Sequence, residues 1–410
     1  MHNVGSIIRD TAQRTYQVLQ ELGEGGQGKA LLVEGSNSHR RYIAKVFRAE
    51  FATMATVARI ERMIAHDLPG YSRAFMGPVC TLHPEDGVGY LMGRAPGRPL
   101  QQVLEEDALT LGAALGLALS IVTPLALLER RGIGHGDISA NNFIVETVDG
   151  GYISRPIDLD NATLPDAPPA PCMGQDLYVA PELATRRASP SLKSDRFAIA
   201  VLMSEVLLGR HPFSPYVAAD APYEDYLALV AEGRWPDDPT RGSGRETGRV
   251  LANALSQPLL SLFNRAFGRE RAERPRMHEW ESALRDSLGH VFACASCGNE
   301  SVNRRDRVRC PWCDGSPPDR GFKLPSGKTV CLEKLVTVLG RADVGDIATV
   351  SREHVAITRE GFAIVAEALS TNGLMVRTDD RWIRYAKGER VVLAPGDLIY
   401  FAEAQIGEIV

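Results

Sequence analysis

The sequence predicts a multidomain fold: a mixed α+β unit of two lobes, then a small cysteine-containing segment, then an all-β unit. Three observations lead to this expectation. A chain of 410 residues is too long for one hydrophobic core, so two or three domains are expected. Strand-like runs and one helical segment fill residues 15–93, helical periodicity dominates residues 94–290, and short β runs separated by turns follow residue 322. Two Cys-x-x-Cys pairs lie between the second and third parts.

Composition excludes several classes of protein. The hydrophobic fraction is 44% and the net charge is −5, so neither disorder nor a generally nucleic-acid-binding or membrane-coating surface is indicated. The first residues lack the apolar core of a signal peptide, and four of the seven cysteines sit in pairs that suit metal binding in a reducing compartment. We therefore expect a cytoplasmic protein.

One uncharged stretch, residues 108–128, is long enough to span a bilayer. It contains Ser120, Thr123 and Pro124 near its far end and continues directly into a loop with candidate functional residues. We expect a buried helix of the second lobe here, and the alternative is a membrane span.

A glycine-rich motif begins the first strand-like region. The stretch "LGEGGQGKA" has the pattern G-x-G-x-x-G, which alone is a weak signal, and its glycines are Gly23, Gly25 and Gly28. A dinucleotide-binding fold would need a helix immediately afterwards, whereas "KALLVEG" reads as a strand. The pattern therefore favours a hairpin that covers phosphates.

Charged residues follow this hairpin at informative positions. Lys45 lies in the strand-like "YIAKVF", from which its ammonium could reach nucleotide phosphates. Glu61, in the helical "ARIERMI", is the expected ion-pair partner of Lys45, and Glu50 is the second choice.

The second lobe carries further motifs in a fixed order. The stretch "GHGDISANNFIV" gives His135, Asp137 and Asn142 the spacing H-x-D-x-x-x-x-N, and "RPIDLDNA" contains Asp158. The later members of the series are Ala180, Pro181 and Glu182 in "YVAPEL", Asp195 in "SDRFAIAV", and Arg274 in "AERPRMHEW". Together these motifs resemble the eukaryotic type of protein kinase over residues 15–290, with a small lobe over 15–93 and a large lobe over 94–290.

The resemblance implies an ATP site that works by positioning and charge neutralisation. The glycine hairpin would cover the phosphates, and Ala30 and Ile43 would together cover the adenine. Their sizes are exchanged relative to the usual kinase pattern, which roughly conserves volume. Lys45, held by Glu61, would contact the α- and β-phosphates.

The resemblance also implies metal and acceptor sites. Asn142 and Asp158 would hold Mg²⁺, or Mn²⁺ in its place, and Asp137 would accept or orient the substrate hydroxyl. His135 is expected to support the loop, and Glu182 with Arg274 to form a buried ion pair that braces the large lobe.

Several positions depart from the family pattern. Asp160 stands where glycine is usual, which reduces backbone freedom. Gly136 replaces the arginine that often reads an activation-segment phosphate, and the segment 161–179 offers only Thr163 and Tyr178 as hydroxyl acceptors. Ser139 replaces the lysine of serine/threonine kinases.

Gln175 likewise stands where threonine often supports that lysine. These departures leave two interpretations: an active kinase of the serine/threonine type, or a pseudokinase scaffold that binds nucleotide and phosphopeptides without transfer. We favour the active enzyme because Lys45, Asp137, Asn142 and Asp158 are all present.

Residues 291–316 predict a structural zinc ribbon. Two Cys-x-x-Cys pairs separated by twelve residues can supply four thiolates to a tetrahedral Zn²⁺, and they are Cys294, Cys297, Cys310 and Cys313. Paired disulfides and a redox role are the alternatives. The basic tip "NRRDRVR" could contact nucleic acid, but a solvated hairpin end is favoured, so we do not expect a nucleic-acid partner.

Residues 320–410 carry "VLGRADV", "TVSREHVAI" and "LSTNGLMV", an order that resembles a forkhead-associated (FHA) domain. Such domains are β-sandwiches that bind phosphothreonine peptides through loops at one end. The guanidinium of Arg341 can bind a phosphate, with added hydrogen bonds from Ser351 and Asn372. Arg352 and Thr371 are weaker candidates on the same loops. Gly340 and His354 are expected to be structural supports.

The whole pattern resembles bacterial kinases of the eukaryotic-like type. We expect protein substrates and phosphothreonine-containing proteins as partners. We do not expect the protein to bind a membrane. A metal-dependent phosphatase and a von Willebrand A-type protein are implied by the resemblance alone.

Overall fold

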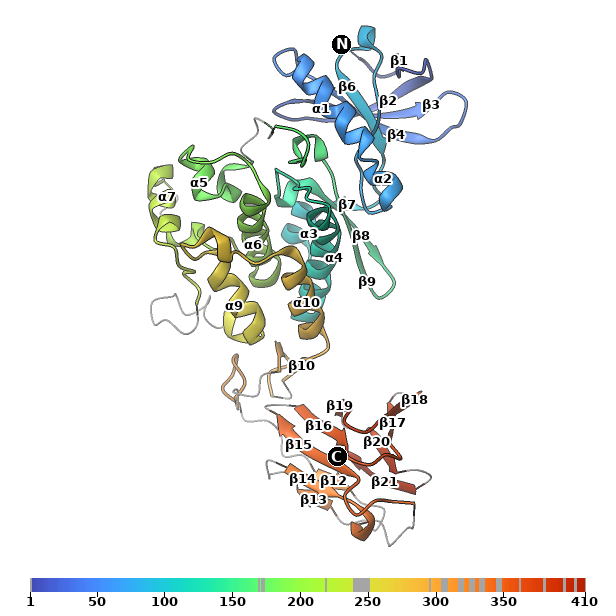
Figure 1. The fold of residues 1–410 in the computed structure, drawn as a ribbon, viewed down its shortest axis with the longest axis vertical. Coiled ribbons are helices and arrows are strands. Elements are labelled where there is room, and N and C mark those ends of the chain that lie inside the picture. Colours follow the sequence, from blue (N-terminus) through green and yellow to red (C-terminus); the bar gives the residue numbers. More distant parts are fainter. Residues whose placement is uncertain are drawn as a thin grey trace. The chain divides into compact units, whose positions relative to one another are not determined.

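The computed structural model describes residues 2–168, 170, 174–217, 220–238, 251–294, 296–303, 309–315, 321–323, 329–331, 336–343, 349–360, 363–378, 381–393, 396–401 and 404–409. The chain forms two compact units (Figure 1). The first comprises Met1–Ala252 and Pro258–Leu288, and the second comprises Asn253–Gln257 and Gly289–Val410.

The first unit begins with a six-stranded antiparallel sheet. Its spatial order is β1-β2-β3-β4-β6-β5, and the strands are β1 (Ile7–Arg9), β2 (Thr15–Glu24), β3 (Gly28–Gly35), β4 (Arg41–Phe47), β5 (Pro78–Thr81) and β6 (Gly89–Gly93). In the expected small lobe, buried side chains of these strands alternate between the two faces of the sheet. Val33 and Ala44 pack on one face, whereas Ile43 and Tyr90 pack on the other.

The helix α1 (Met54–Ala65) covers the second face of this sheet and is followed by the short α2 (Leu68–Tyr71). Its first turn is capped because the side chain of Thr53 accepts a hydrogen bond from the backbone N–H of Thr56. Ile60 and Met63 form its buried face, three residues apart as an amphipathic helix requires.

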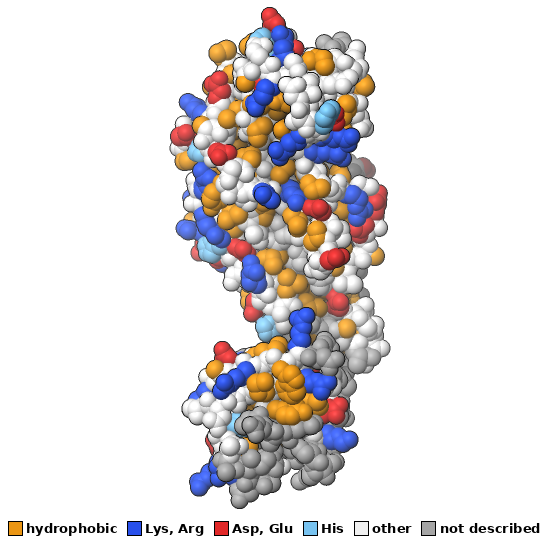
Figure 2. Space-filling model, turned by 90° about the vertical axis from the view of Figure 1, so that its right-hand side faces the viewer, with side chains coloured by type: hydrophobic (Ala, Val, Ile, Leu, Met, Phe, Trp, Pro, Cys, Tyr) orange, Lys and Arg blue, Asp and Glu red, His pale blue; other side chains and the backbone are white. Residues whose placement is uncertain are grey.

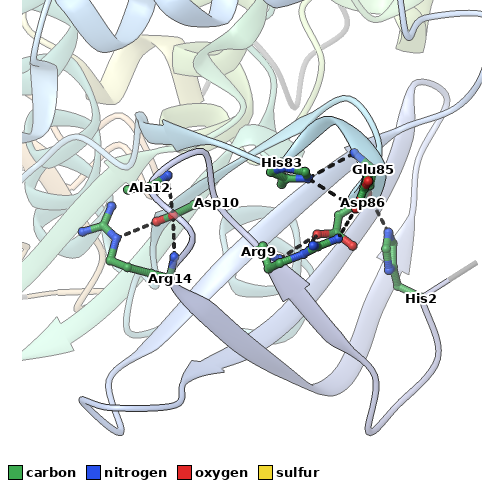
Figure 3. Close-up of polar contacts among 8 residues, drawn as sticks. All are labelled: His2, Arg9, Asp10, Ala12, Arg14, His83, Glu85 and Asp86. Atoms are coloured by element: carbon green, nitrogen blue, oxygen red, sulfur yellow. Dashed lines mark hydrogen bonds and ion pairs between the residues drawn. The ribbon is translucent and has the colours of Figure 1, made fainter.

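Polar contacts fix the edge strand β1 to the rest of the sheet (Figure 3). Arg9 donates from Nε to Asp86 Oδ2 at 3.0 Å and from a terminal nitrogen to Glu85 Oε2 at 2.9 Å. The carboxylate of Asp10 is fully buried and accepts three hydrogen bonds from Ala12 and Arg14. Hydrogen bonding of this kind is what makes a buried carboxylate tolerable.

The rest of the first unit is mainly helical, with a three-stranded antiparallel sheet. Its helices are α3 (Leu100–Glu106), α4 (Leu111–Arg130), α5 (Pro181–Ala184), α6 (Leu192–Leu208), α7 (Tyr223–Ala231), α9 (Gln257–Ala266) and α10 (Met277–Leu288). Its strands are β7 (Arg98–Pro99), β8 (Phe143–Val148) and β9 (Gly151–Pro156), and short 3-10 turns include η2 (Ala140–Asn142), η3 (Leu159–Asn161) and η4 (Asp176–Tyr178).

The apolar helix α4 is long and apolar enough to cross a membrane by length and composition. In this structure it packs against α10, β9 and α6, and 56% of its most apolar window is buried. Pro124 lies inside the helix and is itself buried. The packing agrees with the buried helix expected from the sequence.

The second unit is rich in β-structure. β10 (Val291–Ala293) pairs with β11 (Glu300–Val302), and two further sheets follow. One has the order β13-β12-β21-β20-β17-β18 and contains β12 (Gly321–Lys323), β13 (Thr329–Cys331), β17 (Leu374–Thr378), β18 (Arg381–Tyr385), β20 (Leu398–Phe401) and β21 (Ala404–Ile409). The other has the order β14-β15-β16-β19 and contains β14 (Val336–Leu339), β15 (Val355–Glu360), β16 (Ala363–Ala368) and β19 (Arg390–Leu393).

One hydrophobic core joins these two sheets. It includes Ile357 and Ala366 from the four-stranded sheet and Val376, Ile399 and Phe401 from the six-stranded one. Figure 2 also shows hydrophobic side chains gathered on part of this unit's surface. The exposed large apolar residues described in the unit are Val336, Val338, Trp382, Ile383 and Val392.

Candidate active site

A cleft of about 730 Å³ lies in the first unit between the β2–β3 hairpin and loops of the helical lobe. Most of the predicted nucleotide-site residues line it, namely Gly23, Gly25, Gly28, Ala30, Lys45, Asp137, Asn142 and Asp158. Two predicted members do not line it. Ile43 packs in the apolar cluster with Ile60 and Tyr90, and Glu61 is an exposed residue of α1.

The glycine hairpin approaches the neighbouring strand closely. Gly25 N donates to Gly28 O at 2.8 Å, which closes the tip. A Cβ on Gly28 would lie 2.2 Å from the carbonyl oxygen of Val46, so this position requires glycine. Gln27 donates from Nε2 to Asn161 Oδ1 at 3.2 Å, and this bond joins the hairpin tip to the loop after β9.

Lys45 is 8% exposed and extends from β4 into a pair of carboxylates. Its Nζ lies 3.0 and 3.2 Å from the two carboxylate oxygens of Asp160 and 3.3 Å from Asp158 Oδ1. Burial lowers the pKa of Lys45, but these two carboxylates outweigh burial and raise it. Lys45 is therefore held as a cation.

The expected ion pair between Lys45 and Glu61 is not formed in this structure, so that prediction requires correction. Glu61 is exposed, because Ile60 is the residue at this turn of α1 that packs toward the sheet. Glu50, the second choice, is also exposed. From the resemblance to kinases we expected a glutamate of α1 to pair with Lys45. In this structure the residue that pairs with Lys45 is Asp160.

The loop before η2 is fixed by Asp195 of α6. The carboxylate of Asp195 accepts hydrogen bonds from His135 N at 2.6 Å and Gly136 N at 3.1 Å. Gly136 has φ +78°, and a Cβ there would lie 2.1 Å from the carbonyl oxygen of Asn161. The close approach to the loop after β9 therefore requires glycine at position 136. This structural reason is separate from the missing arginine noted in the sequence.

Asp137, Asn142 and Asp158 meet at the floor of the cleft. Asn142 donates from Nδ2 to the carbonyl oxygen of Asp137 at 2.7 Å, which orients the amide. Burial, with the nearby carboxylates of Asp158 and Asp160, raises the pKa of Asp137, and burial also raises the pKa of Asp158. Asp137 Oδ1 is buried and has no hydrogen-bond partner among the described residues.

This donor set fits a divalent cation. Carboxylate and amide oxygens suit Mg²⁺, which binds few protein ligands and completes its shell with phosphates and water. A bound cation would offset both the burial and the carboxylate repulsion that raise the pKa values of Asp137 and Asp158. The chain can therefore hold a metal–nucleotide complex at Asn142 and Asp158.

Neighbouring residues support the loop. His135 is 1% exposed, and burial lowers its pKa to about 4, so it stays neutral. Its Nδ1 accepts a hydrogen bond from Asp137 N at 3.3 Å, and its ring stacks on Phe143. These contacts agree with the expected structural position. The ion pair expected between Arg274 and Glu182 is confirmed, with two bonds of 2.7 and 3.0 Å between nearly inaccessible side chains.

The hydroxyls of the activation segment are already engaged. Thr163 is 9% exposed, and its Oγ1 accepts a hydrogen bond from Gly134 N at 3.1 Å. Tyr178 donates to Glu205 and accepts from Ala140 N at 3.3 Å. Both hydroxyls therefore already have hydrogen-bond partners within the fold. Residues 169 and 171–173 of this segment lie outside the described residues.

The two remaining departures from the kinase pattern differ in position. Gln175 lines the cleft and accepts a hydrogen bond from Asn141 Nδ2 at 3.2 Å. Ser139 is completely buried and does not line the cleft. Its hydroxyl therefore does not substitute for the ammonium of the usual lysine.

A second possible metal site lies in the second unit. The sulfurs of Cys294, Cys297, Cys310 and Cys313 all lie within 4.8 Å of one another, with pairs at 3.8 and 3.9 Å. A tetrahedral metal with bonds of about 2.3 Å would separate its sulfur ligands by about 3.8 Å. Each Cys pair folds as a tight turn, closed by Gly298 N to Cys294 O and by Asp314 N to Cys310 O.

The pKa values of the thiols in this cluster shift in opposite directions, because burial and the neighbouring thiols raise those of Cys310 and Cys313. Burial disfavours the thiolate of Cys294, but backbone N–H donors of Cys297 and Ser296 outweigh burial and lower its pKa to about 6. Residues 304–308 of the basic tip lie outside the described residues.

The loops predicted to bind phosphopeptide meet at one end of the second unit. Arg341 donates from its backbone N to Ser351 O at 2.9 Å and from Nε to Val350 O at 2.8 Å. Asn372 donates from Nδ2 to Thr349 O at 2.8 Å, and both Arg352 and Thr371 are exposed on these loops.

Supporting residues fix these loops from beneath. His354 is fully buried, contacts the carbonyl oxygen of Gly373 through Nε2 at 2.9 Å and stacks on Phe401. A Cβ on Gly340 would lie 1.8 Å from the carbonyl oxygen of Arg352, so glycine is required. Both residues occupy the supporting positions that the sequence predicted.

Comparison with known proteins identifies the first unit. The protein kinase domain family matches residues 16–282. The serine/threonine-protein kinase pkn2 of Myxococcus xanthus is 28% identical over 206 residues, which cover 48% of this chain and 25% of that protein. The serine/threonine-protein kinase PrkC of Bacillus subtilis is 26% identical over 206 residues, which cover 48% of this chain and 31% of that protein.

A third relative, the serine/threonine-protein kinase PknD of Mycobacterium tuberculosis, is 25% identical over 205 residues, which cover 48% of this chain and 30% of that protein. The chain thus matches about a quarter to a third of the length of these relatives. Since the family match covers more than half of the chain and the ordered motifs meet around one cleft, the chain belongs to the protein kinase domain family.

Proposed function

We propose that the chain is a protein kinase of the serine/threonine type that uses ATP with Mg²⁺ or Mn²⁺. The observation that carries this proposal is the meeting of Lys45, Asp137, Asn142 and Asp158 in one cleft beneath a glycine hairpin. The acceptor class is supported by the similarity of the chain to three serine/threonine-protein kinases.

The proposed mechanism depends mainly on positioning. The backbone of the glycine hairpin covers the phosphates, and Lys45 neutralises charge on the α- and β-phosphates. Asn142 and Asp158 would hold the metal, which would supply positive charge to neutralise the phosphate oxygens. Asp137 orients the substrate hydroxyl and accepts its proton as the oxygen bonds to the γ-phosphorus and the bond to ADP breaks.

The scaffold interpretation has one observation in its favour. Ser139 is buried and does not line the cleft, so this residue does not replace the usual lysine near the γ-phosphate. A slow enzyme and a scaffold differ in transfer but not in nucleotide binding, and only a transfer assay separates them.

The second unit would supply two further functions. We propose that Cys294, Cys297, Cys310 and Cys313 bind a structural Zn²⁺, because their sulfur spacing suits a tetrahedral ion without an open position. We also propose an FHA domain that reads phosphothreonine through Arg341, Ser351 and Asn372, with Arg352 and Thr371 at its margin.

The proposed domain limits are 15–290 for the kinase, 291–316 for the zinc ribbon and 320–410 for the FHA domain. The proposed setting is cytoplasmic, which the cysteine usage supports. The proposed partners are protein substrates and phosphothreonine-containing proteins, and by family resemblance a metal-dependent phosphatase and a von Willebrand A-type protein.

The transfer assay uses labelled ATP, Mg²⁺ and a generic substrate, with phosphosites mapped by mass spectrometry. Asp158→Ala removes a metal ligand and should reduce label incorporation at least a hundredfold while the melting temperature stays near that of wild type. Asp166→Ala is the matched control, because Asp166 is an exposed carboxylate of the same segment that pairs with His66. Equal labelling by wild type and a folded Asp158→Ala variant would contradict the proposal.

A further inference from the structure

We propose that Asp160 is the positioning residue that anchors Lys45 for the nucleotide, in place of an acidic residue on α1. This inference rests on the proposed kinase function. It assigns a role to a position where the sequence pattern has glycine and where only a loss of backbone freedom was expected.

The contacts of Asp160 are specific and buried. The residue is 4% exposed, and both of its carboxylate oxygens lie within 3.2 Å of Lys45 Nζ. Tyr90, which is completely buried in β6, donates a hydrogen bond to Asp160 Oδ1 at 3.0 Å. The tyrosine hydroxyl and the lysine ammonium therefore fix the carboxylate from two strands of the sheet.

The helix α1 does not supply an alternative anchor. Its sequence contains a single acidic residue, Glu61, which is exposed. The buried face consists of Ile60 and Met63. Arg59 donates instead to the carbonyl oxygens of Ala162 at 2.9 Å and Pro168 at 2.6 Å. Helix α1 thus binds the segment after Asp160, and the anchor of Lys45 comes from the loop that contains Asp160.

Asp158 and Asp160 are distinguished by their positions. Asp158 lines the cleft, is about one-third exposed and lies 3.3 Å from Lys45. Asp160 does not line the cleft, and Lys45 and Tyr90 already occupy its oxygens. Asp158 therefore lines the cleft in which the metal and the phosphates would bind, whereas Asp160 contacts Lys45 and does not line the cleft.

This arrangement has a consequence for regulation. The anchor of Lys45 belongs to η3, which directly follows Asp158 along the chain. Lys45 is therefore aligned by the same loop that carries the proposed metal ligand. The ion pair itself contains no residue of α1, and α1 contributes through Arg59, which bonds to the segment that follows Asp160.

A double-mutant cycle tests the inference. We would measure the Kd of a non-hydrolysable ATP analogue with saturating Mg²⁺, and the kcat and KM for ATP, in wild type, Asp160→Asn, Lys45→Met and the double variant. Asp160→Asn should raise Kd and KM at least tenfold in the wild-type background. In the Lys45→Met background it should change Kd less than twofold, because a residue that acts through Lys45 has no effect without it.

Two additional variants control for folding and charge. Asp166→Asn makes the same change at an exposed carboxylate of the same segment and should leave Kd within twofold of wild type. Tyr90→Phe removes one hydrogen bond to Asp160 while keeping the ring, and it should raise Kd by about threefold. If Asp160→Asn does not fold, this milder variant, tested with and without Lys45→Met, decides the question in the same way.

Three outcomes would overturn the inference: unchanged nucleotide affinity in Asp160→Asn, an equal loss in both Lys45 backgrounds, or, in a separate Mg²⁺ titration, a higher Mg²⁺ requirement for nucleotide binding in Asp160→Asn than in wild type. The last would make Asp160 a metal ligand. The binding readout is independent of phosphoryl transfer. A wild-type protein that binds nucleotide but never transfers phosphate would contradict the proposed function, and the role of Asp160 would still be decided.

Discussion

A partly buried carboxyl beside the activation segment should make the stability of the protein depend on pH. Glu205 of α6 is part-buried and accepts the hydrogen bond of Tyr178 in the activation segment. Burial raises the pKa of Glu205 to about 7, although the hydrogen bond from Tyr178 acts in the opposite direction. The carboxyl is thus poised to ionise near neutral pH.

The raised pKa of Glu205 predicts a pH-dependent stability. In the unfolded chain this carboxyl ionises near pH 4.5, and in the folded protein it ionises near pH 7. Unfolding therefore releases a proton between these values, and the folded state loses stability as pH rises through this window. Glu205→Gln stays neutral, so its melting temperature relative to wild type should be higher at pH 8 than at pH 5.5.

The measurement is thermal unfolding of both proteins at the two pH values. His135 and His211, whose pKa values burial lowers to about 4, titrate in both proteins and cancel in the difference. Glu105→Gln, at an exposed glutamate of α3, is the control and should show no such trend. A difference between wild type and Glu205→Gln that is equal at both pH values would refute the raised pKa.

Among structural elements, α1 shows most clearly what the sequence could and could not predict. The helical segment was predicted, and Ile60 and Met63 bury the face that their three-residue spacing indicates. Glu61 was chosen as the partner of Lys45 by residue type. Each residue of a helix turns by about 100°, so the residue after a buried isoleucine points elsewhere. The apolar spacing was the signal that could have excluded Glu61.

The anchor of Lys45 was harder to predict for a different reason. Asp160 was visible in "DLDN", but its contacts come from Lys45 and Tyr90, which are 115 and 70 residues away in sequence. Such long-range contacts depend on how two strands of one sheet and a loop of the helical lobe meet in space. The members of the Glu182–Arg274 pair are also far apart in sequence, by 92 residues, but there the family pattern supplied the pairing.

The cysteine cluster is a small element whose stability should depend on its metal. β10 and β11 have three residues each, too few to form an independent hydrophobic core. We predict that a strong chelator unfolds this element locally, since binding free energy and folding free energy are one quantity in such sites. Nucleotide binding by the kinase unit should persist.

Trp312 provides a direct readout of this transition. It packs against the cysteine cluster and donates from Nε1 to Glu300 O at 2.9 Å. Its fluorescence should shift to the red on chelation and on Cys297→Ser, and Trp312→Phe should abolish the signal. Cys80→Ser, at a half-buried cysteine of the first unit, is the control. Purified protein with no zinc by elemental analysis would contradict the assignment.

At the scale of the whole molecule, the chain joins a kinase unit to a β-rich unit whose phosphate-reading function is proposed. Contacts group the cysteine segment with the β-rich unit, whereas the division into three parts stays a prediction from sequence. Linking a reader to an enzyme converts a second binding event into an intramolecular one. Effective concentrations in the mM range are typical of short flexible linkers, so a modest affinity for phosphothreonine would suffice to hold a primed substrate.

Arg341 is the residue on which this coupling should depend. Its backbone and Nε are already bonded to Ser351 and Val350, which fixes the base of the side chain at the loop end of the unit. A hydrogen bond between charged groups contributes about 1.5–3 kcal/mol. We therefore predict that Arg341→Ala weakens binding of a phosphothreonine peptide at least tenfold and leaves transfer to a generic unphosphorylated peptide unchanged.

The matched control is Arg381→Ala. Arg381 pairs with Thr378 at the turn of the β17–β18 hairpin, whereas Leu374, beside the Asn372 loop, pairs with Tyr385 at the other end. The same charge is thus removed away from the proposed phosphate site, and peptide affinity should stay within twofold of wild type.

Calorimetry with matched phosphorylated and unphosphorylated peptides measures the affinities, and initial rates on a primed substrate measure the coupling. If the primed substrate is phosphorylated equally fast by wild type and Arg341→Ala while peptide binding is lost, the two units work independently. If phosphorylated and unphosphorylated peptides bind wild type alike, the β-rich unit does not read phosphate.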